Sequence, residues 1–167
     1  MKHILLAAAT LALAPIAQAG EIHISFSEEL NEKIADDYGE RERERLVDEL
    51  TEDLMREFAP ILSSVGDVNV VIEDARPNRP TFEQMTEQSL SFESISIGGA
   101  EMTGEVFSLS GELIASEEYD YFSHDITDSV GRATWSDARR AFSRFATRFA
   151  DTTEEAMSAS STDEVGR

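Results

Sequence analysis

The sequence predicts an α+β fold in which a mixed four-stranded sheet carries two amphipathic helices on one face, in the order β-α-β-β-β-α. Three observations predict it. Apolar and polar residues alternate at 21–26 and 67–74, which is the period of a half-buried strand. Apolar residues recur at helical spacing in 40–62 and again from 134 onward. A turn signal at 110–111 separates two further strand-like segments.

The first two strands are joined by a helix. Strand 21–26 places its apolar residues on one side, and the helical segment 40–62 carries one apolar stripe on an otherwise charged surface. Because the connection is a helical crossover, strands 21–26 and 67–74 should pair in parallel within a right-handed β-α-β unit. The stripe of the helix consists of Leu46, Leu50, Leu54 and Phe58.

A hairpin should complete the sheet. Residues 90–109 are strand-like with an interruption, and Gly98-Gly99 is the expected place of a kink. Ser110-Gly111 is a two-residue turn signal, so the chain should return antiparallel over 112–122. Pairing across this turn sets apolar residues opposite apolar residues on both faces. The predicted pairs are Val106 with Ala115, Met102 with Tyr119, and Phe107 with Ile114.

The strongest helical signal follows a polar loop over 123–133. Thr134 is expected to cap this helix, with Asp137 three residues later in the manner of a capping box. Its apolar stripe has the spacing of one buried face, so we expect it to belong to the core rather than to a ligand groove. The stripe consists of Trp135, Ala138, Phe142, Phe145 and Phe149.

The N-terminus has the three parts of a secretory signal peptide over residues 1–19. Lys2 supplies a positive charge, residues 4–16 form an uncharged apolar run, and Ala17-Gln18-Ala19 is a small-x-small cleavage site. The run is shorter than the roughly 20 apolar residues that span a bilayer. We therefore expect export and cleavage, with a soluble mature protein in the periplasm or outside the cell.

The remaining chain divides into a folded part and a tail. Residues 156–167 are small, polar and acidic, which predicts a disordered acidic tail. Residues 20–155 are then a single α+β domain, long enough to bury one core.

The composition limits the classes of partner. The net charge is −20, from 34 acidic and 14 basic residues. A surface this negative repels nucleic acid and anionic lipid, and favours cationic partners or divalent ions. It also suits a host that lives in salty water. The chain has no cysteine, which excludes disulfides, thiolate metal sites, thiol nucleophiles and a cysteine-borne lipid anchor.

Motifs for catalysis are absent from the sequence. His23 lies on the outward side of the first strand and His124 in an expected loop, so neither has partners for a nucleophilic triad. The sequence has no G-x-S-x-G, H-E-x-x-H, EF-hand or glycine-rich phosphate motif. We therefore name no catalytic residue, no metal ligand and no cofactor, and favour a binding role over an enzymatic one.

One group of candidate binding residues lies in a stiff loop. Arg76 and Arg79 alternate with two prolines, and a guanidinium on a rigid loop suits bidentate contact with carboxylate or phosphate. The alternative is a structural clasp in which Glu73 and Asp74 pair with these arginines. In either case we expect Phe82 to pin the loop to the core.

A second group lies on the last helix. Arg140, Arg144 and Arg148 repeat every four residues, which places them in a basic strip along one side. This strip could dock an acidic segment of an envelope protein or an anionic glycan. The alternative is that acids from neighbouring elements neutralise it.

Three segments carry a family resemblance: 72–82 (IEDARPNRPTF), 96–100 (SIGGA) and 134–142 (TWSDARRAF). They resemble small exported (periplasmic) proteins of proteobacteria with a domain of unknown function, over most of the mature chain. The resemblance implies an envelope setting and carries over no catalytic residue. More loosely, the order of elements is similar to small periplasmic domains that accompany outer-membrane assemblies.

Together these observations predict an exported soluble periplasmic protein that acts as a non-catalytic binding or envelope-assembly module through its arginine-bearing loop and helix. Two other functions remain open at this point. One is a carboxylate-dependent hydrolase, and the other is a structural protein that binds divalent ions.

Overall fold

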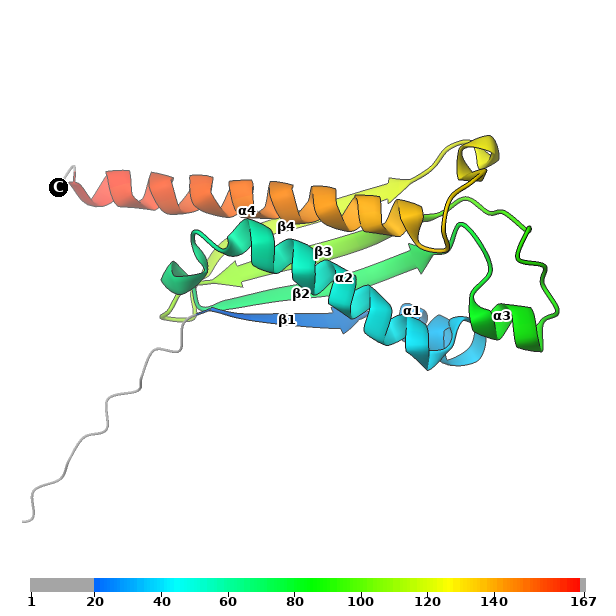
Figure 1. Ribbon diagram of the computed structural model, residues 1–167. Helices are drawn as coiled ribbons and strands as arrows, with labels where there is room; N and C mark the ends of the chain where they lie inside the picture. The colour runs from blue at the N-terminus through cyan, green and yellow to red at the C-terminus, as the bar shows by residue number, and fades with distance from the viewer. Residues whose placement is uncertain (1–19, 166–167) are drawn as a thin grey trace, which may run out of the picture.

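The computed structural model describes the backbone of residues 20–165, so the signal peptide expected at 1–19 lies outside the described residues. Figure 1 shows a sheet with helices laid across one of its faces. In chain order the elements are β1 (Glu21–Phe26), α1 (Glu28–Lys33), the π-helical turn η1 (Ile34–Tyr38), α2 (Glu40–Phe58), the 3₁₀ turn η2 (Leu62–Ser64), β2 (Asp67–Arg76), α3 (Phe82–Glu87), β3 (Gly99–Phe107), β4 (Leu113–Phe122), the 3₁₀ turn η3 (Ile126–Ser129) and α4 (Ser136–Val165).

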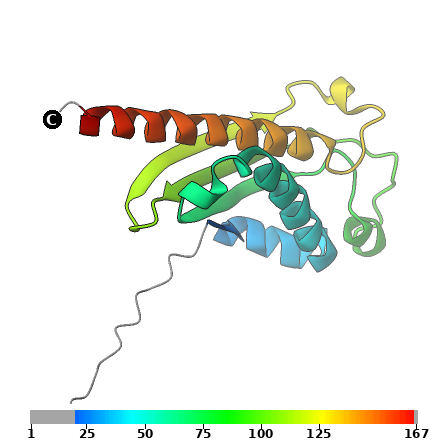
Figure 2. The ribbon, with the colours of Figure 1, turned by 60° about the vertical axis from the view of Figure 1, so that its left-hand side comes forward.

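The sheet has the order β1-β2-β3-β4, with β1 and β2 parallel and the other pairs antiparallel. The long helices α2 and α4 both cover the same face, as the two views in Figures 1 and 2 agree. The predicted α+β class, mixed four-stranded sheet and one-sided helical layer are therefore confirmed. The opposite face is exposed and acidic, because Glu101, Glu105, Glu118 and Asp120 lie on it.

The two helix stripes form the core as their spacing predicts. Leu50, Leu54 and Phe58 of α2 are fully buried, as are Phe145 and Phe149 of α4. The stripes meet where the Phe58 and Phe149 rings pack edge-to-face with centroids 5.2 Å apart. The Phe145 and Phe149 rings stack on each other and lie over β3.

Gly104 of β3 lets the stacked rings approach the sheet. A Cβ added at Gly104 would stand 2.6 Å from the Phe149 ring, closer than real Cβ contacts allow. A glycine within a strand normally weakens it, and here it makes room for aromatic packing.

The hairpin register is confirmed at two of its three predicted pairs. Val106 faces Ala115 and Met102 faces Tyr119, but Phe107 faces Leu113 rather than Ile114. The register shifts between Val106 and Phe107 because the turn is longer than two residues. The N–H of Ser108 donates to the Glu112 carbonyl at 2.7 Å, so the turn spans residues 108–112.

The strand expected over 90–109 is shorter than its pattern suggests. β3 begins at Gly99, and residues 90–98 form an irregular segment. Its backbone bonds go to other loops: the N–H of Ser96 donates to the carbonyl of Asn78 at 3.0 Å. The expected kink at Gly98-Gly99 is thus the point where the strand starts.

Both ends of the last helix differ from the prediction. α4 begins at Ser136, and the N–H of Asp137 donates to the side chain of Asn78, not to Thr134. At the other end, the disordered tail predicted over 156–167 is wrong over 156–165, because α4 continues to Val165. Residues 150–165 contain no proline or glycine, and Met157 still packs against the core.

Within residues 20–165, no helix combines the length and the apolar character that crossing a bilayer requires.

Candidate functional site

The five arginines predicted from the sequence separate into two groups in the structure. Arg76 and Arg79 line a common cavity beyond the end of β2. Arg140, Arg144 and Arg148 lie along α4, over the tyrosines of β4.

The cavity has a volume of about 350 Å³ and is formed by the end of β2, η1, α3 and the irregular segment 88–98. Two prolines and a capped helix fix the backbone that forms its walls. Pro77 and Pro80 are buried and restrict the backbone between the arginines. Thr81 and Gln84 form a capping box that starts α3 immediately afterwards. The apolar lining residues are Pro77, Pro80, Leu90, Ile95 and Ile97.

Arg76 lines this cavity and its side chain is half exposed. Its Nε donates to Asp74 at 2.8 Å, and its guanidinium lies 4.7 Å from the centroid of the Phe122 ring. Asp74 also accepts from Lys33 at 3.1 Å. Lys33 also pairs with Glu29 at 2.8 Å, so Arg76 belongs to a network of two cations and two carboxylates.

Arg79 makes the clasp that the sequence offered as an alternative. Its Nε donates to the carbonyl of Arg132 at 2.6 Å, and its Nη1 donates to the carbonyl of Phe92 at 2.9 Å. The guanidinium also lies over the Phe92 ring, 5.3 Å from its centroid. Both acceptors are neutral carbonyls, and Arg79 forms no ion pair with another described residue. Arg79 therefore joins two loops and keeps its charge uncompensated.

A buried polar cluster supports the loops behind the cavity. Asn78 is fully buried, and its amide donates to Asp137 at 2.6 Å and to Ser129 at 3.2 Å. Its side-chain oxygen accepts from the N–H of Asp137 at 2.9 Å. Gly98 is packed so closely on this amide that an added Cβ would stand 2.5 Å from it. Asn78 therefore fixes three loops relative to the start of α4.

Exposed apolar side chains gather around the same region. Of the nine large apolar side chains that are exposed in the described part of the chain, six lie in α3, in segment 88–98 or in the loop after β4. Figure 1 shows these segments at one end of the molecule, away from the C-terminus. We call this surface the loop end and define it by Phe82, Leu90, Phe92, Ile97, Ile126 and Val130. The expectation that Phe82 pins the loop to the core is wrong, because 62% of this residue is exposed.

The arginines of α4 lie against the tyrosines of the edge strand β4. Arg140 and Arg144 both lie against the Tyr121 ring, at 5.4 and 5.2 Å from its centroid. Arg148 lies over another β4 ring and pairs with Glu117 at 2.9 Å. The expected neutralisation by acids therefore holds for Arg148, whereas Arg140 and Arg144 contact a tyrosine.

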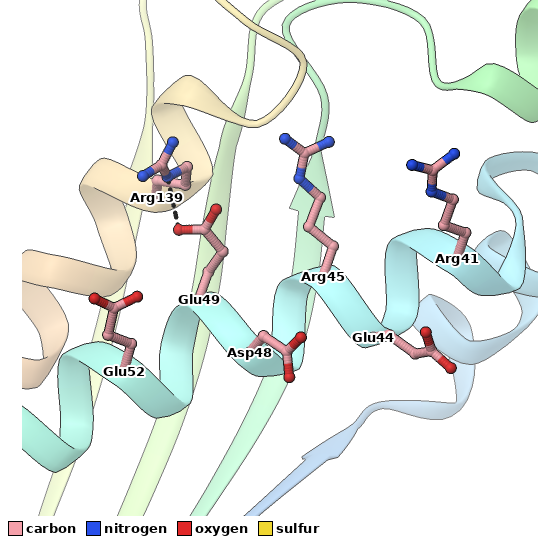
Figure 3. A pocket seen from close by; sticks show the side chains of 7 residues that line it. All are labelled: Arg41, Glu44, Arg45, Asp48, Glu49, Glu52 and Arg139. Atoms are coloured by element: carbon pink, nitrogen blue, oxygen red, sulfur yellow. Dashed lines mark ion pairs between the residues drawn. The ribbon is translucent and has the colours of Figure 1, made fainter.

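A second hollow lies on the surface of α2 beside α4, with a volume of about 540 Å³. Figure 3 shows its side chains, with Glu49 paired to Arg139 at 2.8 Å across the two helices. All seven lining residues are charged: Arg41, Glu44, Arg45, Asp48, Glu49, Glu52 and Arg139. With no apolar wall, this hollow offers little hydrophobic contact to a ligand.

The buried carboxylates have structural partners. Glu42 accepts from the indole N–H of Trp135 at 2.6 Å. Oδ2 of Asp137 accepts from Asn78, whereas its Oδ1 forms no hydrogen bond with a described residue and lies 3.6 Å from Nη1 of Arg132. Arg43 lowers the pKa of exposed Glu40, and the hydrogen bonds from Thr127 lower the pKa of exposed Asp125. A glycosidase acid needs the opposite shift. Among the side chains that the structure describes, residues 20–160, no group of three or more acidic or histidine residues is placed to hold a metal ion.

Tyr38, which lines the cavity, makes the free energy of unfolding depend on pH in the alkaline range. Burial raises the pKa of its hydroxyl, and the nearby Asp74 adds to this effect. A raised pKa means that the folded protein keeps a proton that the unfolded chain loses near pH 10. We therefore expect the free energy of unfolding to fall as the pH rises past about 10. Urea unfolding of the wild type and Tyr38→Phe between about pH 9 and 11 checks this, and an equal decline in both would contradict it.

Most of the residues that form this cavity could not be predicted from the sequence, because no local pattern marks them. Tyr38, Asn78 and the segment 88–98 come together only in the folded chain. The two loop arginines were the available signal, since their type and rigid setting pointed to recognition.

Comparison of the chain with known protein families finds no family model that matches, and a search of curated proteins finds no match either. The resemblance to exported proteins of proteobacteria therefore stays a prediction.

Proposed function

We propose that this chain is an exported, non-catalytic binding module of the bacterial cell envelope, which holds a partner protein at its loop end. Export is inferred from the signal-peptide features of residues 1–19. The surface chemistry of the loop end supports binding.

The observation that carries the proposal is the combination of exposed apolar side chains with arginines at one end of a very acidic protein. Phe82 and Phe92 are 62% and 59% exposed, and Arg79 lies directly against the second of them. Clustered exposed apolar groups mark interaction sites on soluble proteins. Aromatic residues and arginine are also the types enriched in protein interfaces.

A protein partner fits this surface better than a glycan or a second copy of the chain. The apolar side chains extend from α3 to the loop after β4, which is a larger surface than one sugar unit covers, and apolar side chains form no hydrogen bonds with a sugar. Two copies would each bring a net charge of −20 and repel one another. An anionic glycan remains an outcome that the experiment below detects.

Site-specific photocrosslinking tests the proposal. A benzoylphenylalanine is placed at Phe92 in the loop end, at Met55 on α2 or at Thr147 on α4, and each protein is expressed in its native host. Met55 is a matched control because it is 49% exposed and lies outside the loop end. We expect one polypeptide adduct from position 92, about tenfold less from position 55, and recovered protein that begins at Gly20.

The adduct at position 92 should also disappear when Arg76→Glu is added, since this change reverses the charge beside the loop end. Equal adducts at positions 92 and 55 would contradict the proposal, as would adducts only at position 147. Glycan rather than polypeptide in the adduct would contradict the choice of partner.

A further inference from the structure

On the premise of the proposed function, we infer that the cavity at the loop end binds the free C-terminal carboxylate of a partner polypeptide whose last residue is apolar. The site consists of Arg76 and Arg79 together with the apolar wall formed by Pro80, Leu90 and Ile97.

The charge of the cavity is opposite to that of the protein. The chain carries 34 acidic residues, yet the charged residues that line this cavity are two arginines. Two acids lie near the cavity: Asp74 pairs with Arg76 and Lys33, and Asp37 accepts from the neutral amides of Gln84 and Gln88, which leave its negative charge in place. An anionic ligand would therefore compete with Asp74 for Arg76 and would meet Arg79, which has no carboxylate partner among the described residues.

Both arginines keep hydrogen-bond donors free for a ligand. Arg76 uses Nε for Asp74, so both of its Nη groups remain available. Arg79 uses Nε and Nη1 for the two loop carbonyls, which leaves Nη2. The two Nη groups of Arg76 can both donate to one carboxylate, and Nη2 of Arg79 can donate one further bond. The bonds to the two loop carbonyls hold Arg79 in position before the ligand arrives.

The apolar wall favours a ligand in which an apolar side chain lies next to the carboxylate. A C-terminal residue carries its carboxylate and its side chain on the same Cα, so both reach a small cavity together. An internal Asp or Glu would bring its charge into the cavity without an apolar group for Leu90 and Ile97. The volume of about 350 Å³ is near the lower end of ligand cavities and suits one or two residues.

The surroundings favour a polypeptide over a small apolar acid. Phe82 and Phe92 lie exposed outside the cavity and can pack against the residues that precede a chain terminus. A fatty acid shares the carboxylate chemistry but would leave most of this outer surface uncovered.

Peptide binding to the mature protein, residues 20–167, tests the inference. The probes are pools of fluorescent pentapeptides that end in Leu, Ile, Val or Phe, prepared once with a free carboxylate and once as the amide. Fluorescence anisotropy should show that the acids bind about tenfold or more tightly than the amides. Arg76→Gln should remove that preference, and Arg76→Lys should restore only part of it, because lysine lacks the fork.

Two further variants make the result specific. Arg56→Gln is the control, since Arg56 pairs with Asp53 on α2 away from the loop end, and it should bind as the wild type does. Asp74→Asn removes the carboxylate that competes for Arg76 and should tighten binding of the acids severalfold. Circular dichroism checks that each variant is folded.

The outcomes separate this inference from the proposed function. Equal binding of acids and amides, or no binding of either, overturns the inference even if the crosslink at position 92 persists. Octanoate that binds as tightly as the peptide acids overturns the choice of a polypeptide terminus. Acid-selective binding without a position-specific crosslink supports the cavity chemistry and counts against the proposed envelope partner.

Discussion

Replacing Phe149 with alanine should lower the free energy of unfolding by about 3–5 kcal/mol, the largest effect that we expect from a single change. Phe149 is fully buried and connects both helix stripes to the sheet. Its ring packs on Phe58 of α2 and on Phe145 of α4, and lies directly over Gly104 of β3. Since Gly104 has no side chain that could fill the space, the cavity left by the ring should persist.

Urea unfolding followed by the fluorescence of Trp135, the single tryptophan, measures this effect. Phe149→Leu keeps part of the volume and should lose about 1–2 kcal/mol, so the series remains measurable if the alanine variant does not fold. The control is Phe82→Ala, which removes the same ring from an exposed position and should change stability by less than about 0.5 kcal/mol. Similar losses at positions 149 and 82 would contradict the arrangement of the core.

Asn78→Ala should lower the free energy of unfolding by about 2–4 kcal/mol. The change leaves the N–H and a carboxylate oxygen of Asp137 without their partner, and the hydroxyl of Ser129 loses one of its two hydrogen bonds. Asn78, Ser129 and Asp137 are all buried, so water does not readily replace the lost hydrogen bonds. The loops that form the cavity should loosen as well, because Asn78 holds them at the start of α4.

The matched control is Asn69→Ala, because Asn69 lies on the exposed face of the sheet and should lose less than about 0.5 kcal/mol. Amide hydrogen exchange provides a second readout. We expect faster exchange at the backbone N–H groups of Ser96 and of position 78, which bond across these loops, and unchanged exchange in β1. An Asn78→Ala variant as stable as Asn69→Ala would mean that this cluster does not hold the loops.

The regular elements could be predicted because their periodicity reports burial. The alternation of Val68, Val70 and Ile72 follows the buried side of β2, and the pair Met102 and Tyr119 follows from matching two such patterns. The parallel pairing of β1 and β2 needed only the helix between them. These features depend on neighbours in sequence and on one buried face.

The loops could not be predicted because their contacts are distant in sequence. Asn78 bonds to Ser129 and Asp137 across 51 and 59 positions, and no local pattern connects them. The same contact explains why Thr134 is not the cap of α4. The C-terminal helix was missed for a different reason: small and acidic residues resemble a disordered composition, although residues 156–165 form part of α4.

The candidate site was predicted only in part for the same reason. The chemistry of Arg76 and Arg79 predicts a binding role and both line one cavity, whereas the apolar side chains around them carry no sequence signature. These apolar side chains indicate a binding surface only because they are exposed, and the exposure of a residue such as Phe92 is set by the tertiary fold.

Chemical-shift mapping tests most directly the central claim that the loop end is the binding surface. Amide spectra of the isotope-labelled mature protein are recorded while the free-acid peptide pool is added. Our account expects the largest shifts at residues 76–98 and 126–133, with little change in β1 or along residues 140–148 of α4. Shifts concentrated on the acidic face of the sheet or on α4, with the loop end unchanged, would contradict it.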